Sequence, residues 1–266
     1  MSERDGYQPG VPCWVDTWQP DVEAAVGFYT TLFGWEAEEA ARATPGRRHF
    51  MCRLRGRDVA GIGSPPPDGA PPAWGTYVCV ESADATAASA RDAGGGVVVE
   101  PFESLDGGRM AILSDPAGAV FGVWQPGAHK GAQLVNEPGA WSMSQLGTSD
   151  PDGATAFYGA IFGWETESFG DIIMWRVPGY LGGEPEQPVS REVVATMAPL
   201  TSDVPDGTPP HWNVDFWVRD VDAAAATAAE LGGKVVAPPF ATPVGRTGVL
   251  ADPQGAAFSV SQVGPA

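Results

Sequence analysis

The sequence is poor in basic residues and has no long apolar run. Its 266 residues include 15 Lys and Arg against 33 Asp and Glu, which gives a formal net charge of -18. A protein that binds nucleic acid or an anionic membrane surface needs a basic face, so this charge balance argues against both partners. No apolar stretch approaches the roughly 20 residues of a transmembrane helix. The polar start MSERDGYQPG lacks the apolar centre of a signal peptide, so we expect a cytoplasmic protein.

Cysteine and histidine, the commonest transition-metal ligands, are also scarce. The three cysteines lie in apolar segments of the first half without a Cys-x-x-Cys pair, so we expect reduced core residues and no structural zinc site. His49, His129 and His211 are the only histidines, and we expect them to be exposed or to cap the core. Arginine far outnumbers lysine, and glycine, proline and alanine are abundant, a composition typical of a GC-rich bacterial genome.

The chain does contain an internal repeat. Three blocks return in the same order: FYTTLFGWE as FYGAIFGWE, a Trp-led segment ending in Asp-Ala, and Gly-Arg followed by Asp-Pro-x-Gly and Phe. Repetition of this kind predicts two homologous domains. We place them at 1–126 and 139–266, joined by a Pro- and Gly-rich linker at 127–138. Uneven spacing of the blocks predicts insertions in the second copy within 178–192 and 200–210.

Each copy has the same order of predicted elements. Segment 11–18 is a strand, and the helix that follows begins at an aspartate N-cap, Asp21 or Asp150. The helix ends at Gly34 or Gly163, since glycine adopts the left-handed cap conformation at low cost. Strand, helix and several strands then recur. The fold class is therefore α+β, with two βαβββ-like modules in each domain.

Together, the FYxxxFGW helix end, the Trp-led strand and the DPxG turn resemble the vicinal oxygen chelate superfamily. That superfamily includes glyoxalases, extradiol dioxygenases and bleomycin-resistance proteins. The resemblance covers nearly the whole chain, as a tandem two-domain member. It implies that the paired modules of each domain form a half-open, barrel-like cleft, which in metal-dependent members holds a divalent metal bound by His, Glu or Gln.

The positions that the resemblance assigns to metal ligands carry other residues in this chain. In the two domains they fall on Trp14, Gly75 and Gly122 and on Met143, Asn213 and Ser259. Such residues are poor ligands for divalent ions. We therefore expect no metal cofactor in either domain.

The cleft predicted for the first domain is aromatic. Strand alternation puts Trp14, Asp16 and Trp18 on one face, and we expect Tyr77 and Trp124 to join them. These rings could stack a flat or hydrophobic ligand, or they could fill the cleft as core. A carboxylate among them would be desolvated and could act as a general base, or it could be a rim residue bonded to backbone.

The cleft predicted for the second domain is more polar, and Asp215 is its best candidate for acid–base work. The alternative is a satisfied polar network in a degenerate pocket. The residues expected to share this cleft are Met143, Gln145, Asn213, Asp215, Trp217, Ser259 and Ser261.

Arg109 and Arg246 recur at the same place in the two copies. They could clamp a carboxylate or phosphate. We favour the alternative that each pairs with the aspartate of the nearby Asp-Pro-x-Gly turn and holds the hairpin.

Several functions fit the sequence. The first is a metal-free binding protein of the glyoxalase and bleomycin-resistance type, holding a hydrophobic or aromatic metabolite such as an antibiotic or its precursor. The second is a metal-independent tailoring enzyme of secondary metabolism that uses Asp16 or Asp215. A metal-dependent glyoxalase- or dioxygenase-like enzyme with displaced ligands and a structural protein with filled clefts are further alternatives. Tandem domains already supply the module pairing that single-domain relatives obtain by dimerising, so we expect a monomer or a homodimer.

Overall fold

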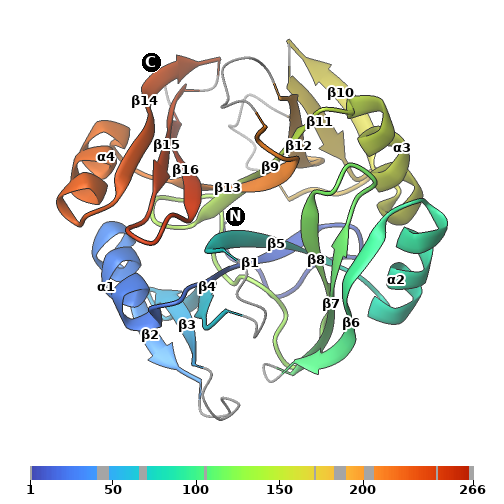
Figure 1. The fold of residues 1–266 in the computed structure, drawn as a ribbon, viewed down its shortest axis with the longest axis horizontal. Helices are drawn as coiled ribbons and strands as arrows, with labels where there is room; N and C mark the ends of the chain where they lie inside the picture. Colours follow the sequence, from blue (N-terminus) through green and yellow to red (C-terminus); the bar gives the residue numbers. More distant parts are fainter. Residues whose placement is uncertain are drawn as a thin grey trace.

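The computed structural model describes residues 2–40, 48–65, 71–104, 107–170, 172–182, 190–200, 207–243 and 245–263. The chain forms two open sheets of eight strands, one from each half of the sequence, with helices at the periphery (Figure 1). None of the helices within these residues is long and apolar enough to cross a membrane.

The first sheet pairs two βαβββ modules. Its strand order is β2-β3-β4-β1-β5-β8-β7-β6. The first strands of the two modules, β1 and β5, run antiparallel at the centre, and each is parallel to the last strand of its own module. The elements are β1 (Pro12–Trp18), α1 (Val22–Phe33), β2 (Glu36–Glu39), β3 (His49–Leu54), β4 (Arg57–Gly63), β5 (Ala73–Cys79), α2 (Ala83–Asp92), β6 (Gly96–Ser104), β7 (Gly108–Ser114) and β8 (Val120–Gln125).

The second sheet repeats this plan in the order β10-β11-β12-β9-β13-β16-β15-β14. The α+β class and the paired modules predicted from the sequence are confirmed, and the sheets stay open. The elements are β9 (Trp141–Thr148), α3 (Pro151–Phe162), β10 (Glu165–Phe169), β11 (Ile172–Arg176), β12 (Val193–Pro199), β13 (His211–Trp217), α4 (Val221–Glu230), β14 (Lys234–Thr242), β15 (Gly245–Ala251) and β16 (Ala257–Val263).

The predicted helix caps are present in both copies. The Asp21 side chain accepts a hydrogen bond from the Ala24 N–H, and Asp150 accepts one from the Gly153 N–H. These bonds satisfy donors that have no partner within the helix. The helices end at Gly34 and Gly163, whose φ angles of 72° and 70° lie in the left-handed region.

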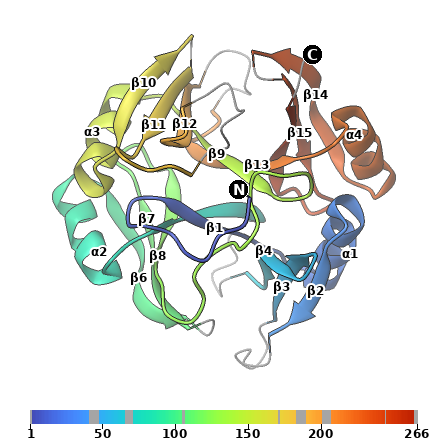
Figure 2. The same ribbon diagram turned by 180° about the vertical axis from the view of Figure 1, so that it is seen from behind.

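The two domains meet through their helices and through strands β5 and β13. Helix α1 lies beside α4 and α2 beside α3, in both views of the molecule (Figures 1 and 2). The ring of Phe33 on α1 is 4.8 Å from Phe216 on β13, and Tyr158 on α3 is 5.4 Å from Phe121 on β8. The first helix of each domain therefore packs against its own sheet and also contacts the sheet of the other domain. We call the face that carries Tyr77 in the first sheet and Asp215 in the second the inner face.

Two tyrosine–aspartate hydrogen bonds cross the interface. The Tyr29 hydroxyl donates to Asp252 Oδ2 at 2.9 Å, and the Tyr158 hydroxyl donates to Asp115 Oδ2 at 3.3 Å. Each tyrosine comes from an FYxxxFGW segment and each aspartate from a DPxG turn. Burial raises the pKa of both tyrosines well above the ordinary value, so both remain neutral donors.

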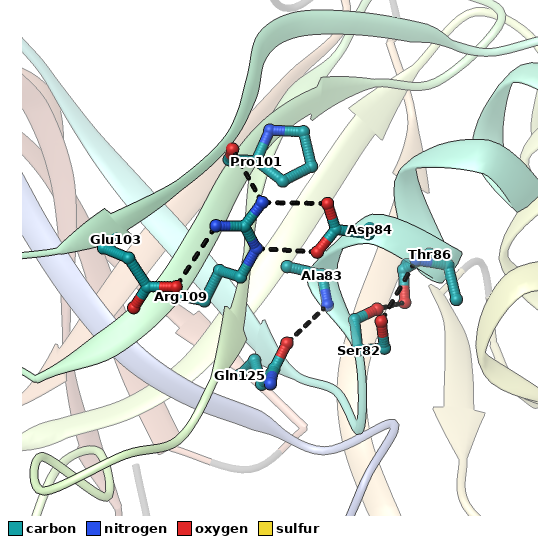
Figure 3. Close-up of polar contacts among 9 residues, drawn as sticks. Ser82, Ala83, Asp84, Thr86, Pro101, Glu103, Arg109 and Gln125 are labelled. Atoms are coloured by element: carbon teal, nitrogen blue, oxygen red, sulfur yellow. Dashed lines mark hydrogen bonds and ion pairs between the residues drawn. The ribbon is translucent and has the colours of Figure 1, made fainter.

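The repeated arginines hold helices instead of turns. Arg109 binds Asp84 with Nε and Nη2, at 2.6 and 2.9 Å. Figure 3 shows this pair. Arg246 binds Asp222 with Nη1 and Nη2. Both partners lie in the first turn of a helix, α2 or α4. The expected pairing with the turn aspartates is wrong, because those carboxylates cap their own turns and bind the tyrosines of the other domain.

We predict that Tyr29→Phe lowers the free energy of unfolding by about 1–3 kcal/mol, because it removes one donor of the buried Asp252 and leaves the buried Trp74 indole N–H without its acceptor. Tyr158→Phe should cost less, since its bond to Asp115 is longer. Urea unfolding of both variants measures the difference. Equal stability of both variants and the parent would show that these bonds do not stabilise the interface.

Candidate functional site

The inner face of the first sheet is packed with aromatic side chains. Trp14, Tyr77 and Trp124 are 5, 2 and 3% exposed. The ring of His129, from the segment between the domains, lies 4.5 Å from the Trp14 ring and 5.5 Å from the Trp124 ring. The Trp124 indole donates to the His129 carbonyl oxygen at 3.1 Å. His129, expected to be exposed or to cap the core, thus covers two of the rings predicted to bind a ligand.

The remaining predicted residues of the first domain lie on the same face. Asp16 is 5% exposed and accepts a hydrogen bond from the Tyr77 hydroxyl at 3.1 Å. Trp18 is half-buried and packs near Gly63. A Cβ at position 122 would lie 2.0 Å from a ring carbon of Tyr77, so this ring fills the space beside Gly122. Ligand binding by these residues stays a prediction.

The inner face of the second sheet lines a cavity of about 380 Å³. All seven residues that the sequence assigned to this cleft contribute to its wall: Met143, Gln145, Asn213, Asp215, Trp217, Ser259 and Ser261.

Smaller side chains explain why this face is hollow. In the first sheet Tyr77 pairs with Gly122 across β5 and β8, whereas in the second Asp215 pairs with Ser259 across β13 and β16. The repeat aligns these pairs, so a carboxylate stands where the first domain has a phenol ring. Ser261 likewise stands where the first domain has a tryptophan. The missing rings leave room for a ligand.

Asp215 is the only carboxylate in the cavity wall among the described residues. Ser142 Oγ donates to Asp215 Oδ2 and Ser261 Oγ donates to Asp215 Oδ1, both at 2.6 Å. Burial raises the pKa of Asp215 to about 6, against the opposing effect of the two serine hydroxyls. The side chain is partly exposed because it faces the cavity. The Asp215 carboxyl group therefore combines a raised pKa of about 6 with a position in the cavity wall.

Ser142 was missed from the sequence. Simple alternation with Met143 places its side chain on the opposite face. The pairing of β9 with β13 shifts register here, from Met143↔Asp215 to Trp141↔Phe216. Ser142 is the extra residue of this β-bulge, and the bulge turns its hydroxyl toward Asp215. No sequence signal marks the bulge.

Other polar groups line the same wall. Asn213 Nδ2 donates to Ser259 Oγ at 2.6 Å. The Gln145 side chain makes no hydrogen bond to another described residue, and it lines the cavity. Apolar side chains, among them Met174 and Val249, complete the wall.

The N-terminal segment covers part of the cavity. Arg4 and Tyr7 line it, and the Arg4 guanidinium donates to the Gly182 carbonyl oxygen. Tyr180, at the start of the insertion predicted at 178–192, also lines the cavity. Of the two predicted insertions, residues 183–189 and 201–206 lie outside the described residues.

The positions that the sequence resemblance assigns to metal ligands carry neutral side chains. In the second cavity these positions offer a thioether, an amide and a hydroxyl, from Met143, Asn213 and Ser259. In the first domain the Tyr77 ring occupies the space beside Gly122. Across the part of the chain that the structure describes, no group of three or more His, Cys, Asp or Glu side chains could hold a metal ion.

Comparison with known proteins gives matches along the whole chain. Residues 14–123 match the Glyoxalase/Bleomycin resistance protein/Dioxygenase superfamily, and residues 131–261 match a Glyoxalase-like domain. The putative glyoxylase CFP32 of Mycobacterium tuberculosis is 41% identical, covering 100% of this chain and 99% of the relative. The anthracycline biosynthesis protein DnrV of Streptomyces peucetius is 35% identical, covering 97% of this chain and 94% of the relative.

Solved structures show the same fold at low identity. The Mn(II)-bound glyoxalase from Novosphingobium aromaticivorans has a TM-score of 0.63 at 16% identity, covering 96% of this chain and 82% of that chain. The 2,3-dioxygenase LapB from Pseudomonas sp. KL28 has a TM-score of 0.63 at 15% identity, covering 97% and 94%. These likenesses concern the fold alone.

We predict that Asp215→Asn stabilises the protein more at neutral pH than in acid. An unfolded aspartate has a pKa of about 3.9, and the folded Asp215 has one of about 6. Between these values the unfolded state loses its proton first, so this group's contribution to wild-type stability falls as pH rises. Below this pH window Asp215 is protonated in both the folded and the unfolded state. Above it, the folded protein bears the full free-energy cost of ionising the buried Asp215. The variant's free energy of unfolding relative to wild type should therefore rise by up to about 3 kcal/mol from pH 4 to pH 7.

Urea unfolding across this pH range measures the rise. Asp152→Asn is the control, because it removes the same charge from an exposed position. A flat difference between Asp215→Asn and wild type would contradict the raised pKa.

Proposed function

Because the chain belongs to the vicinal oxygen chelate superfamily of glyoxalases, bleomycin-resistance proteins and dioxygenases, as a tandem two-domain member, we propose that it binds a small organic molecule in its second-domain cavity. One observation carries the proposal. The inner face that is packed with rings in the first domain is hollow in the second, where Asp215 and Ser259 replace Tyr77 and Gly122. The volume of about 380 Å³ lies within the range of small-molecule sites.

The wall favours a largely apolar ligand with a few polar groups. Met143, Met174, Val249 and Trp217 provide apolar and aromatic surface. Polar groups include Asp215 and the two serine hydroxyls that donate to it. Few, fixed polar groups in an apolar pocket orient a ligand while burial of apolar surface supplies affinity. Relatives named for glyoxylase activity and for anthracycline biosynthesis support a small organic metabolite as the ligand.

Binding in this proposal needs no metal. The described wall supplies one carboxylate, two arginines and several neutral polar groups. Ligand orientation would then come from hydrogen bonds to these side chains. We therefore expect affinity that is insensitive to chelators.

Acid–base catalysis is the second candidate function. The observation that favours it is Asp215, whose pKa of about 6 suits proton transfer near neutral pH and whose side chain faces the cavity. Asp16, the other carboxylate considered from the sequence, is buried and accepts a hydrogen bond from the Tyr77 hydroxyl. For a ligand that binds, unchanged affinity with lost turnover in Asp215→Asn would establish this role, and unchanged turnover would rule it out.

The neutral fluorescent probe N-phenyl-1-naphthylamine tests the proposal. We predict one bound probe per chain, with a rise in its fluorescence, in the presence of EDTA. Val249→Phe should weaken binding at least about tenfold, because the larger side chain projects into the cavity.

Val120→Phe is the matched control. It adds the same ring at a position that is 49% exposed and outside the cavity wall, so it should leave affinity unchanged. Absence of saturable binding, or equal affinity in the Val249→Phe variant and the parent, would refute the proposed site.

A further inference from the structure

We propose that the second-domain cavity selects ligands that carry a protonated amine, and that the Asp215 carboxylate binds this amine. The inference rests on the proposed function, because it assumes that this cavity holds a small, largely apolar molecule. It adds the charge and the chemical class of the ligand.

Asp215 has hydrogen-bond donors but no counter-charge. Its two partners are the hydroxyls of Ser142 and Ser261, one on each carboxylate oxygen. Among the described residues, no Lys, Arg or His side chain forms an ion pair with it. A carboxylate in a largely apolar wall is costly to ionise unless a cation lies beside it.

The two cations of the cavity wall are engaged elsewhere. Arg246 binds Asp222 in the first turn of α4, and Arg4 donates to the carbonyl oxygen of Gly182. Since neither is paired with Asp215, its negative charge remains for the ligand to neutralise.

An ammonium group suits the donors and acceptors present. A carboxylate can accept about four hydrogen bonds, and the serines supply two of them. A charge-assisted N–H bond to a carboxylate is roughly twice as strong as a neutral one. Folding has already removed much of the water around Asp215. Binding of a cation therefore requires little further desolvation of this carboxylate.

The wall can also satisfy the other N–H groups of an ammonium. Gln145 supplies an amide oxygen in the same cavity, and its side chain has no other hydrogen bond within the described residues. Ser259 adds a hydroxyl oxygen. The apolar body of the ligand would lie against Met143 and Trp217.

The charge of the whole chain acts in the same direction. A net charge of -18 attracts cations and repels anions. This general field does not distinguish one cavity from another. The experiment therefore needs a control variant that removes one negative charge at a site other than Asp215.

Isothermal titration calorimetry at pH 7.5 with three matched probes tests the proposal. The probes are 2-naphthylmethylamine, 2-naphthalenemethanol and 2-naphthoate, which share one apolar body and differ in charge. We expect wild type to bind the amine at least about tenfold more tightly than the alcohol, and the carboxylate most weakly. In Asp215→Asn the preference for the amine over the alcohol should fall to within about threefold.

Asp84→Asn is the charge-matched control. It removes one negative charge from the surface of the first domain, where Asp84 pairs with Arg109. It should keep the wild-type order of affinities. Loss of the amine preference in this variant would assign the preference to net charge and overturn the role of Asp215.

The wild-type ranking decides the matter even if Asp215→Asn does not fold. Three outcomes would overturn the amine proposal and leave the cavity proposal intact. They are equal affinity for the amine and the alcohol, a preference for naphthoate, and no binding of the three probes where phenylnaphthylamine still binds. Failure of phenylnaphthylamine as well would overturn both.

Discussion

The hydrogen bond from a tyrosine of one domain to a turn aspartate of the other is the constraint on which the architecture depends. Tyr29 and Asp252 form it on one side of the molecule, and Tyr158 and Asp115 form it on the other. All four side chains are buried, so each needs its partner. The bonds hold each domain's first helix against the sheet of the other domain. The residues on the inner faces of the two sheets take no part in these bonds.

The two inner faces have diverged although their scaffold is the same. Equivalent strands carry Tyr77 beside Gly122 in the first domain and Asp215 beside Ser259 in the second. In the first domain, the rings and His129 complete a packed interior. In the second, the smaller polar side chains leave a cavity. One copy therefore has a packed inner face, whereas the equivalent face of the other copy lines a cavity.

The second cavity has a single carboxylate in its described wall. The strand positions that the resemblance assigns to metal ligands carry neutral side chains, and this carboxylate lies two residues along β13 from Asn213. Its two serine donors come from β9 and β16, on either side of β13. The negative charge of the described cavity wall is thus carried by one side chain, at which the proposed ligand amine would bind.

The sequence by itself determined the features that arise locally or by repetition: the tandem modules, the aspartate and glycine caps, and the strand faces that brought the seven predicted side chains of the second cavity together. Alternation along a strand is enough for that, because its period does not depend on distant residues. Tertiary structure decided the rest. The bulge at Ser142 depends on pairing with β13, the position of His129 depends on the path of the connecting segment, and the partners of the arginines depend on where α2 and α4 pack. The acidic, exposed strand β2 likewise forms because β3 lies beside it, and its own residues do not favour a strand. Contacts between residues far apart in the chain leave no periodic trace in the sequence, so only the folded structure shows them.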